Sequence, residues 1–186
     1  AVNAYATRDD QNNPVINVTG GMLGHELLTK DGLALILCHE LGHFLGGEPK
    51  KLRGRSSKKS WSSAEGQADY FATASCIKKV FKELPDFIET EEVKKATDNK
   101  KNQKLRLIQE STKICKTPMC KRIALASHNV AKVYASLDWF SGELSLINKD
   151  EYTVYETIYS HPNPQCRLDT MIAALRCPNS EEIVFK

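Results

Sequence analysis

The sequence has no apolar stretch long enough to form a membrane helix. Its longest apolar run is Gly32–Cys38, whereas a spanning helix needs about 20 mostly apolar residues. The formal net charge of the 186 residues is +3, which is too small by itself to indicate nucleic-acid binding. The cysteines include no Cys-x-x-Cys pair, which argues against a cysteine-based zinc site. There is no internal repeat. We therefore expect a soluble chain with no nucleic-acid partner.

The composition suits one folded domain. With 186 residues, 41% of them hydrophobic, the chain can form a single core, and we predict one domain over residues 1–186. The chain starts at Ala1 inside a predicted strand, without a signal peptide. This indicates a processed protein or a catalytic domain from which an N-terminal anchor or signal was removed.

Six cysteines are many for a cytosolic enzyme of this size, and their even number favours an oxidising compartment. We therefore predict an extracytoplasmic location, in the periplasm or the cell envelope. Cys115 and Cys120 are near enough in sequence to close a short loop, and the cysteines at positions 166 and 177 flank a predicted helix. Cys38 and Cys76 lie in apolar helices, where buried free thiols are common. Six cysteines allow about 15 pairings, so the connectivity stays open.

The most informative motif is His-Glu-x-x-His, formed by His39, Glu40 and His43 after an apolar stretch. If this stretch is a helix, the two imidazoles lie roughly 40° apart around its axis and about 6 Å apart along it, so both can bind one ion. Two neutral imidazoles at this spacing suit zinc, and Glu40 lies beside the ion as a base for its water. The alternative is a chance motif in a buried helix, but chance would not also place these polar residues inside so apolar a run.

A catalytic zinc site needs a third protein ligand. In the metzincin pattern this ligand is a histidine at the position of Pro49, which cannot coordinate, so that class is excluded. A glutamate on a second helix is the other possibility. Glu65 follows His43 by 22 positions, and Asp69 comes one helical turn later, where it can accept the outer N–H of a ligand histidine. Ser62-x-x-Glu65 also fits a capping box, but after the His-Glu-x-x-His motif we favour the ligand role.

With these residues in place, the chain resembles the HtpX and CAAX-prenyl-protease type of gluzincin metallopeptidase, in a soluble, minigluzincin-like form. The resemblance covers nearly the whole chain and is weakest over residues 85–150. The matching segments are Val2–Ala6, Ile16–Leu23, Asp31–His43, Glu65–Asp69, Ser160–Pro162 and Arg167–Leu168. The resemblance implies an α+β, zincin-like fold that is mostly helical, with a small N-terminal β-sheet whose edge strand lines the cleft and pairs with a peptide substrate.

The resemblance also implies a role for each matching residue. The implied ligands of one Zn²⁺ per chain are His39, His43 and Glu65. Glu40 would be the general base, and Asp69 would orient a ligand histidine. Asn3 and His161 would point into the cleft and stabilise the oxyanion, an interaction commonly worth about 3–4 kcal/mol, while Arg167 would support that corner. A turn or edge-strand amide is the alternative for Asn3, and a surface histidine before proline is the alternative for His161.

Local patterns predict an α+β order of elements. Residues 2–7 and 15–19 alternate as the two strands of a hairpin, and helices are predicted at about 31–46, 63–83, 118–138 and 164–175. Residues 85–115 are charge-dense over much of their length and form either an exposed helix or a mobile insertion. The positions expected to be buried in the helix at 118–138 are Ile123, Leu125, Val130, Val133 and Leu137.

Three further features have modest implications. Lys50–Lys59 could attract an anionic membrane or envelope surface, as could a removed N-terminal segment, but we favour a flexible solvated loop because no aromatic residue interleaves before Trp61. His25-Glu26 imitates half of the zinc motif but lacks its second histidine, which indicates a structural pair. His128 lies in an amphipathic helix, where packing is favoured over metal binding.

We therefore predict a zinc-dependent endopeptidase that hydrolyses extended or unfolded polypeptides, with Glu40 as the general base. The alternative function is that of a latent or catalytically silent zinc protein that binds peptides. Its cleft would then be open to peptides or plugged by its own chain, either by residues 85–115 or by the tail Glu181–Lys186.

Overall fold

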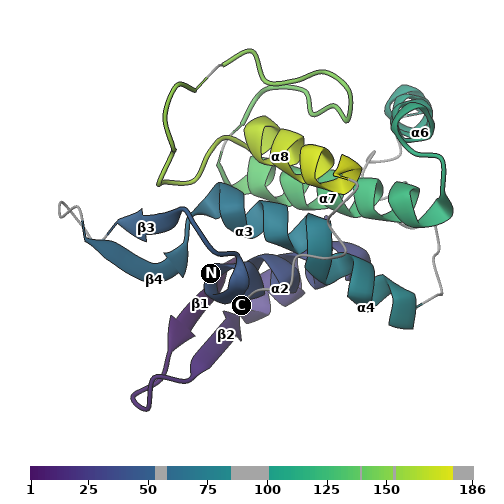
Figure 1. The fold of residues 1–186 in the computed structure, drawn as a ribbon. Helices are drawn as coiled ribbons and strands as arrows, with labels where there is room; N and C mark the ends of the chain where they lie inside the picture. The colour runs from purple at the N-terminus through teal and green to yellow at the C-terminus, as the bar shows by residue number, and fades with distance from the viewer. Residues whose placement is uncertain (53–57, 85–100, 139, 153, 178–186) are drawn as a thin grey trace.

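The computed structural model describes residues 1–52, 58–84, 101–138, 140–152 and 154–177 and shows an α+β protein (Figure 1). Its elements, in chain order, are β1 (Ala4–Arg8), β2 (Pro14–Val18), α1 (Gly20–Leu23), α2 (Lys30–Leu45), β3 (Lys50–Leu52), β4 (Lys59–Ser63), α3 (Glu65–Phe71), the π-helical segment η1 (Ala72–Cys76), α4 (Ile77–Glu83), α6 (Lys101–Ile114), α7 (Pro118–Leu137) and α8 (Pro164–Arg176). None of the described helices is long and apolar enough to cross a membrane.

The strands form two separate antiparallel hairpins. In the first, β1 pairs with β2 with Ala6 opposite Ile16, which confirms the predicted N-terminal hairpin. The second hairpin, β3–β4, lies in the segment that we predicted to be a flexible loop. That prediction is wrong for the described lysines: Lys50 donates to Ser63 Oγ, and Lys59 pairs with Glu48. Residues 53–57 lie outside the described part.

Helix α2 is fixed at its N-terminal end by polar contacts to α7. Thr29 is its N-cap and accepts a hydrogen bond from the Gly32 amide, while Asn129 Oδ1 accepts hydrogen bonds from the Thr29 amide and hydroxyl. In the first turn, both carboxylate oxygens of Asp31 accept hydrogen bonds from the buried guanidinium of Arg122, at 2.7 and 2.8 Å. These contacts hold one end of the helix that carries the zinc motif.

The predicted helix at 63–83 is present, but its hydrogen-bond pattern changes along its length. It begins at Glu65, with Ala64 as an N-cap that makes no side-chain bond, so the capping-box interpretation of Ser62 is wrong. A π-helical turn, η1, separates α3 from α4, and Thr73 donates from its hydroxyl to the carbonyl of Asp69. Such single π turns occur mostly inside α-helices and often at functional sites.

The C-terminal helices match their predicted ranges closely. Pro118 and Pro164 occupy the first helical positions of α7 and α8, and Thr117 and Asn163 cap them. Four of the five positions expected to be buried in α7 are buried, whereas Leu137 is 37% exposed. Of the charge-dense segment at 85–115, the part at 101–114 forms helix α6, and residues 85–100 lie outside the described part.

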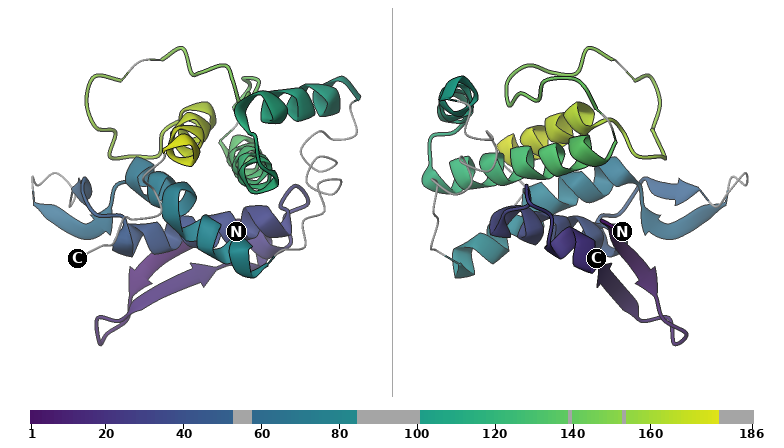
Figure 2. Two further views of the ribbon diagram at one scale, coloured as in Figure 1. Left: turned by 45° about the vertical axis from the view of Figure 1, so that its right-hand side comes forward. Right: turned by 180° about the vertical axis from the view of Figure 1, so that it is seen from behind.

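Four helices pack into the body of the molecule. Figures 1 and 2 show that α7 and α8 lie side by side. Helix α3 lies between this pair and α2, and the β1–β2 hairpin lies on the far side of α2. Helix α2 contacts α3 and α7, while α8 contacts α3 and α7. One buried apolar cluster lies among α2, α4 and α7, and a second lies among α6, α7 and α8.

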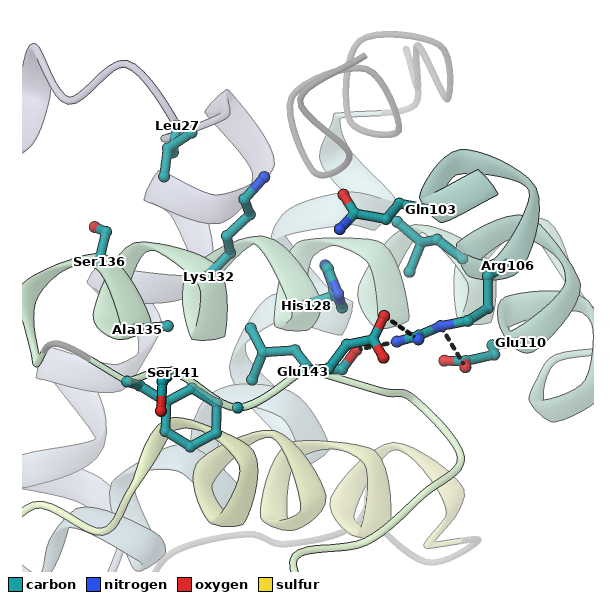
Figure 3. A pocket seen from close by; sticks show the side chains of 14 residues that line it. Leu27, Gln103, Arg106, Glu110, His128, Lys132, Ala135, Ser136, Ser141 and Glu143 are labelled. Atoms are coloured by element: carbon teal, nitrogen blue, oxygen red, sulfur yellow. Dashed lines mark hydrogen bonds and ion pairs between the residues drawn. The ribbon is translucent and has the colours of Figure 1, made fainter. Parts of the chain in front are cut away.

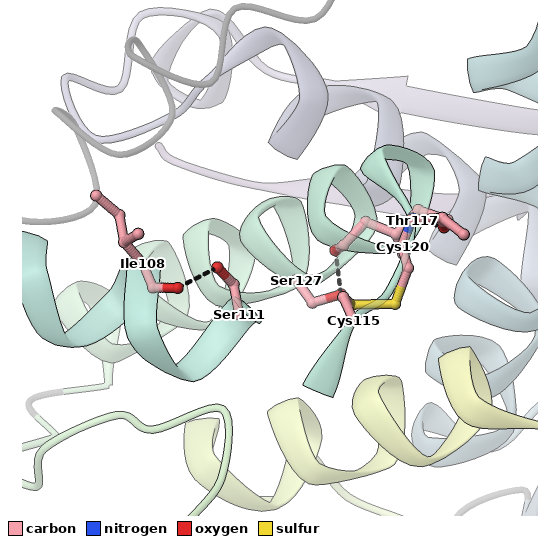
Figure 4. Close-up of a disulfide and its surroundings, with 7 residues drawn as sticks. Ile108, Ser111, Cys115, Thr117, Cys120 and Ser127 are labelled. Atoms are coloured by element: carbon pink, nitrogen blue, oxygen red, sulfur yellow. Dashed lines mark hydrogen bonds between the residues drawn. A yellow bond between two sulfur atoms is a disulfide. The ribbon is translucent and has the colours of Figure 1, made fainter. Parts of the chain in front are cut away.

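Two disulfides connect these elements. Cys115–Cys120, at the joint between α6 and α7, confirms that this pair can close a short loop (Figure 4). Cys38 and Cys76 were expected to be free thiols, and that expectation is wrong. Helix α2 and η1 pack so closely that the two Cα atoms are 5.6 Å apart, within disulfide range, and the cysteines are bonded. Cys166 and Cys177 remain thiols.

Candidate metal centre

Two helices bring His39, His43 and Glu65 together at the centre of the molecule. One possible ligand atom from each residue lies within 4.8 Å of the others, and all three side chains are buried. The histidines come from the middle and end of α2, and Glu65 is the first residue of α3. Glu65 Oε2 lies 3.2 Å from His39 Nε2, and Glu65 Oε1 lies 3.7 Å from His43 Nε2.

Gly42 makes this convergence possible. A Cβ atom on Gly42 would lie 2.8–3.2 Å from the backbone of Ala68, so a side chain here would force α2 and α3 apart. Gly42 lies between the two histidines on α2, while Ala68 lies one turn after Glu65 on α3. The glycine inside the His-Glu-x-x-His motif therefore sets how closely the Glu65 carboxylate approaches the imidazoles.

Each histidine is oriented by an acceptor at its other ring nitrogen. His39 Nδ1 lies 2.7 Å from Asp69 Oδ1, and His43 Nδ1 lies 2.9 Å from the carbonyl oxygen of Ser63. A carbonyl and a carboxylate only accept, so both Nδ1 atoms carry a hydrogen, and both Nε2 atoms face Glu65. This is the usual way in which neighbouring groups hold metal-binding imidazoles. The contact expected between Asp69 and a ligand histidine is thus present.

Arg167 lies behind this pair and lines the same cavity as His161. Its guanidinium donates two hydrogen bonds to Asp69, both at 2.9 Å, and its Cζ lies 4.1 Å from the ring centroid of Tyr134. Arg167, Asp69 and His39 are almost completely buried. The arginine therefore neutralises the carboxylate that orients His39.

The buried charges shift the pKa values of the centre in opposite directions. Burial alone would lower the pKa of His39, but the carboxylates of Asp69 and Glu65 raise it to about 9. Burial, and then His39, lower the pKa of His43 to about 4. Burial opposes ionisation of Asp69, yet Arg167 and His39 lower its pKa to about 2. His39, Arg167 and His43 likewise hold the pKa of Glu65 well below its usual range, although burial opposes this.

Glu40 lies next to the ligand atoms but makes no close contact with them. Its carboxylate oxygens are 4.0 Å from His39 Nε2 and 3.9 Å from His43 Nε2. Burial, with a further contribution from the charge of Glu65, raises the pKa of the Glu40 carboxyl group. A carboxylate at this separation can contact a water held between it and the ligand atoms.

The centre opens into a cavity of about 470 Å³. The chain from Val2 to Ala6 forms one wall, so β1 lines the cleft as expected for the edge strand. Asn3 and His161 also line the cavity, and they are the two residues expected to point into it. The side chain of His161 is 70% exposed, and its Nε2 lies 3.4 Å from Glu65 Oε1. The hydrogen bonds described for Asn3 are made by its backbone, with Thr19.

Three residues that the sequence did not single out belong to the same cavity: Lys51, Trp61 and Tyr134. Lys51 Nζ forms an ion pair with Glu65 Oε1. Trp61 stacks on Phe44, with the ring centroids 4.9 Å apart. No local sequence pattern identifies Lys51 as a residue of this cavity. Its position depends on the β3–β4 hairpin, in a segment that we predicted to be a loop.

The donor set fits a tetrahedral metal ion. Zinc with bonds of about 2.0–2.1 Å to nitrogen and oxygen places its ligand atoms about 3.3 Å apart. Here the imidazole nitrogens lie 3.2 and 3.7 Å from the two different oxygens of Glu65, and one ligand atom from each residue lies within 4.8 Å of the others. Glu65 Oε2 is buried and has no hydrogen-bond partner among the described residues, as expected of an atom that is available to an ion. Two imidazoles and one carboxylate, with one side open to a cavity, could therefore hold a metal ion.

Comparisons of the chain with protein-family models, with curated proteins and with solved structures found no match. The function must therefore be argued from the site itself.

Proposed function

We propose that this chain is a zinc-dependent endopeptidase with a zincin-like fold of the gluzincin type. The observation that carries the proposal is the buried group of His39, His43 and Glu65, with Glu40 beside it on the wall of an open cavity. Since each histidine has its outer nitrogen bound by an acceptor, the group has the neighbouring contacts that metal ligands need. The three residues would hold one Zn²⁺ per chain.

A bound zinc ion would supply a Lewis acid that makes a water molecule nucleophilic near neutral pH. The residues of the chain would perform the remaining steps. Glu40 would accept a proton from that water and return it to the amine that leaves. Its raised pKa suits a group that must take up and release a proton. Asn3 and His161 would donate hydrogen bonds to the oxyanion that develops on the peptide carbonyl.

The substrate would be an extended or unfolded polypeptide. Strand β1 lies along the cavity, and among the described residues its sheet has two strands, so its outer edge can pair with the backbone of a peptide. Two disulfides favour an oxidising compartment, and we accordingly infer an extracytoplasmic location. Association with a membrane or envelope surface through the basic β3–β4 hairpin is part of the same proposal.

A latent or silent peptide-binding protein is the second candidate. The ion pair between Lys51 and Glu65 favours it, because Lys51 occupies one oxygen of a proposed ligand. One measurement distinguishes the two functions. A catalytic centre cleaves casein when loaded with zinc, whereas a binding module retains peptides and leaves casein intact.

Glu40→Gln tests the proposal directly. The amide keeps the shape of the side chain but cannot accept the proton, so the variant should hold one zinc ion per chain and cleave casein at least about 100-fold more slowly than the parent. Metal content by mass spectrometry and casein cleavage are measured on the same samples. Glu26→Gln, an exposed glutamate outside the cavity, is the matched control and should behave like the parent. Equal cleavage by Glu40→Gln and the parent would refute the mechanism.

A further inference from the structure

A second cavity, of about 450 Å³, lies between α6, α7 and the segment at 140–144. Figure 3 shows the Arg106 guanidinium in its wall, paired with the carboxylates of Glu110 and Glu143. Burial, and then nearby cations, lower the pKa of His128 in the same wall to about 4, so its ring is neutral near pH 7. Arg106 and His128 therefore offer no free charge to a ligand.

Arg8, the last residue of β1, is held in a different way. Its Cζ lies 5.2 Å from the ring centroid of Trp61 and 5.5 Å from that of Phe44, and these two rings stack on each other. Its Nη1 donates to the carbonyl oxygen of Asn12 at 2.6 Å. Among the residues that the structure describes, no carboxylate pairs with Arg8. The rings and the carbonyl thus fix the guanidinium in place and leave its charge and its other N–H donors available.

Trp61 connects Arg8 to the metal cavity. Its ring lines that cavity together with the chain from Val2 to Ala6, and the Arg8 guanidinium lies against the same ring. The β1–β2 hairpin, which carries Arg8, and the β3–β4 hairpin, which carries Trp61, project from the same side of the molecule (Figures 1 and 2). A polypeptide that extends from the metal centre along β1 therefore passes the guanidinium.

The pleat of β1 places Arg8 on the face of the strand that lies against α2. Alternate residues of a strand share one face, so Ala4, Ala6 and Arg8 form one row. Strand β1 contacts α2, and Arg8 reaches Phe44 of that helix, so the row faces α2. A peptide residue that pairs opposite Arg8 has its side chain on the same face, with its Cβ about 4.5–5.5 Å from that of Arg8. Opposite charges in such a cross-strand pair attract each other.

We propose that Arg8 determines a substrate specificity by pairing with an acidic side chain of the polypeptide that extends along β1. The inference rests on the proposed function, because it takes β1 as the strand that binds the substrate. Ala4 lines the metal cavity, and a strand rises about 3.4 Å per residue, so the acidic residue lies about 13 Å, or about four residues, from the one opposite Ala4. Arginine suits this role because its planar guanidinium can bind a carboxylate through two parallel hydrogen bonds. The expected substrates are polypeptides with an acidic residue at this distance from the cleaved bond.

The first test is a binding measurement that needs no cleavage. Two fluorescein-labelled peptides, identical except for one glutamate or glutamine in a neutral sequence, are titrated with the Glu40→Gln chain and followed by fluorescence anisotropy. The glutamate peptide should bind about three- to fivefold more tightly at low salt. Adding Arg8→Gln should remove this preference, Arg8→Lys should keep most of it, and Arg8→Glu should shift it to a peptide with lysine at the same position. Lys30→Gln removes one exposed positive charge outside the cavity and is the control that should keep the preference.

The second test reads the position of the acidic residue from cleavage by the zinc-loaded parent. Moving the single glutamate by one residue through a uniform neutral peptide should move the cleaved bond by one residue, as mass spectrometry of the products measures, and Arg8→Gln should cleave at scattered bonds. Equal binding of the two peptides, a preference that survives in Arg8→Gln, or cleavage that does not follow the glutamate would each overturn the proposal. A parent that shows the binding preference but cleaves neither peptide would refute the peptidase function and support Arg8 as a determinant of peptide binding.

Discussion

At the scale of single residues, Arg167 and Asp69 are mutually dependent. Both are buried, and two hydrogen bonds of 2.9 Å join them. Without the guanidinium, Asp69 would be a buried carboxylate with His39 as its main partner. Removing one member of a buried ion pair typically costs about 3–5 kcal/mol, because the other charge stays buried without compensation.

Arg167→Met should therefore lower the free energy of unfolding by about 3 kcal/mol or more. It should also weaken zinc binding about 10- to 100-fold, because the group that orients His39 loses its support. Urea unfolding and a competitive zinc titration measure the two effects. Arg176→Met, an exposed arginine on the same helix, is the matched control. An Arg167→Met variant as stable as the parent would mean that the buried pair does not hold the centre together.

The second prediction at this scale concerns pH. The pKa of His128 falls from 6.5 to about 4 on folding, so the unfolded chain binds a proton on this ring at a pH at which the folded protein does not. Its contribution to stability is complete above pH 6.5 and is lost as the pH falls towards about 4. Lowering the pKa of His128 from 6.5 to about 4 corresponds to about 3 kcal/mol.

Urea unfolding of the parent and of His128→Phe over this pH range checks the prediction. The parent should lose about 3 kcal/mol more than the variant between pH 6.5 and pH 4, because other groups titrate equally in both proteins. Lys121→Met should show the pH dependence of the parent. The same pH dependence in the parent and in His128→Phe would contradict the assignment of this loss to His128.

At the scale of elements, the two disulfides act over different lengths of chain. Cys38–Cys76 closes a loop of 38 residues and joins α2 to η1, whereas Cys115–Cys120 closes one of only 5 residues. In the chain-entropy model, the longer loop is worth about 4 kcal/mol and the shorter about 2 kcal/mol. Cys38 also precedes His39 directly, so its disulfide ties the helix of His39 and His43 to the π-helical turn that follows α3.

Replacing Cys38 and Cys76 together by alanine should thus destabilise the protein by about 4 kcal/mol, about twice the effect of the same replacement at Cys115 and Cys120. Urea unfolding of the two double variants measures the difference. The first variant should also bind zinc more weakly, whereas the second should not. A larger loss of stability in the second variant would show that loop length does not govern these bonds.

Elements set by local patterns could be predicted from the sequence. The β1–β2 hairpin, α2, α7 and α8 follow from alternation, apolar periodicity and capping residues, and the spacing of His39 and His43 follows from the helix period. The β3–β4 hairpin was not predicted, because a run of lysines is typical of a solvated loop. Its role depends on the ion pair between Lys51 and Glu65 of α3, which no local pattern encodes. The pairing of Cys38 with Cys76 depends in the same way on how α2 packs against η1.

At the scale of the whole molecule, metal binding should be coupled to stability. The ligands come from two helices that are packed together only in the folded chain, so the ion should bind the folded form alone. Zinc at about a thousandfold excess over its Kd should then add about 4 kcal/mol to the free energy of unfolding. Thermal unfolding with zinc and with a chelator measures this gain.

Two controls make that measurement specific. Glu65→Gln removes the anionic ligand and should abolish most of the gain. Calcium, which prefers more oxygen ligands than this centre offers, should give little stabilisation. Identical unfolding of the parent with zinc and with chelator would mean that the three residues do not form a metal site.

The position of Arg167 in the chain has a consequence for biosynthesis. It follows Asp69 by 98 residues, and all three proposed ligands precede it. At about 5–20 residues per second, a ribosome adds Arg167 about 5–20 s after Asp69. A nascent chain therefore carries its complete set of metal ligands well before the cation that neutralises Asp69. The centre reaches its final form only when α8 docks against α3.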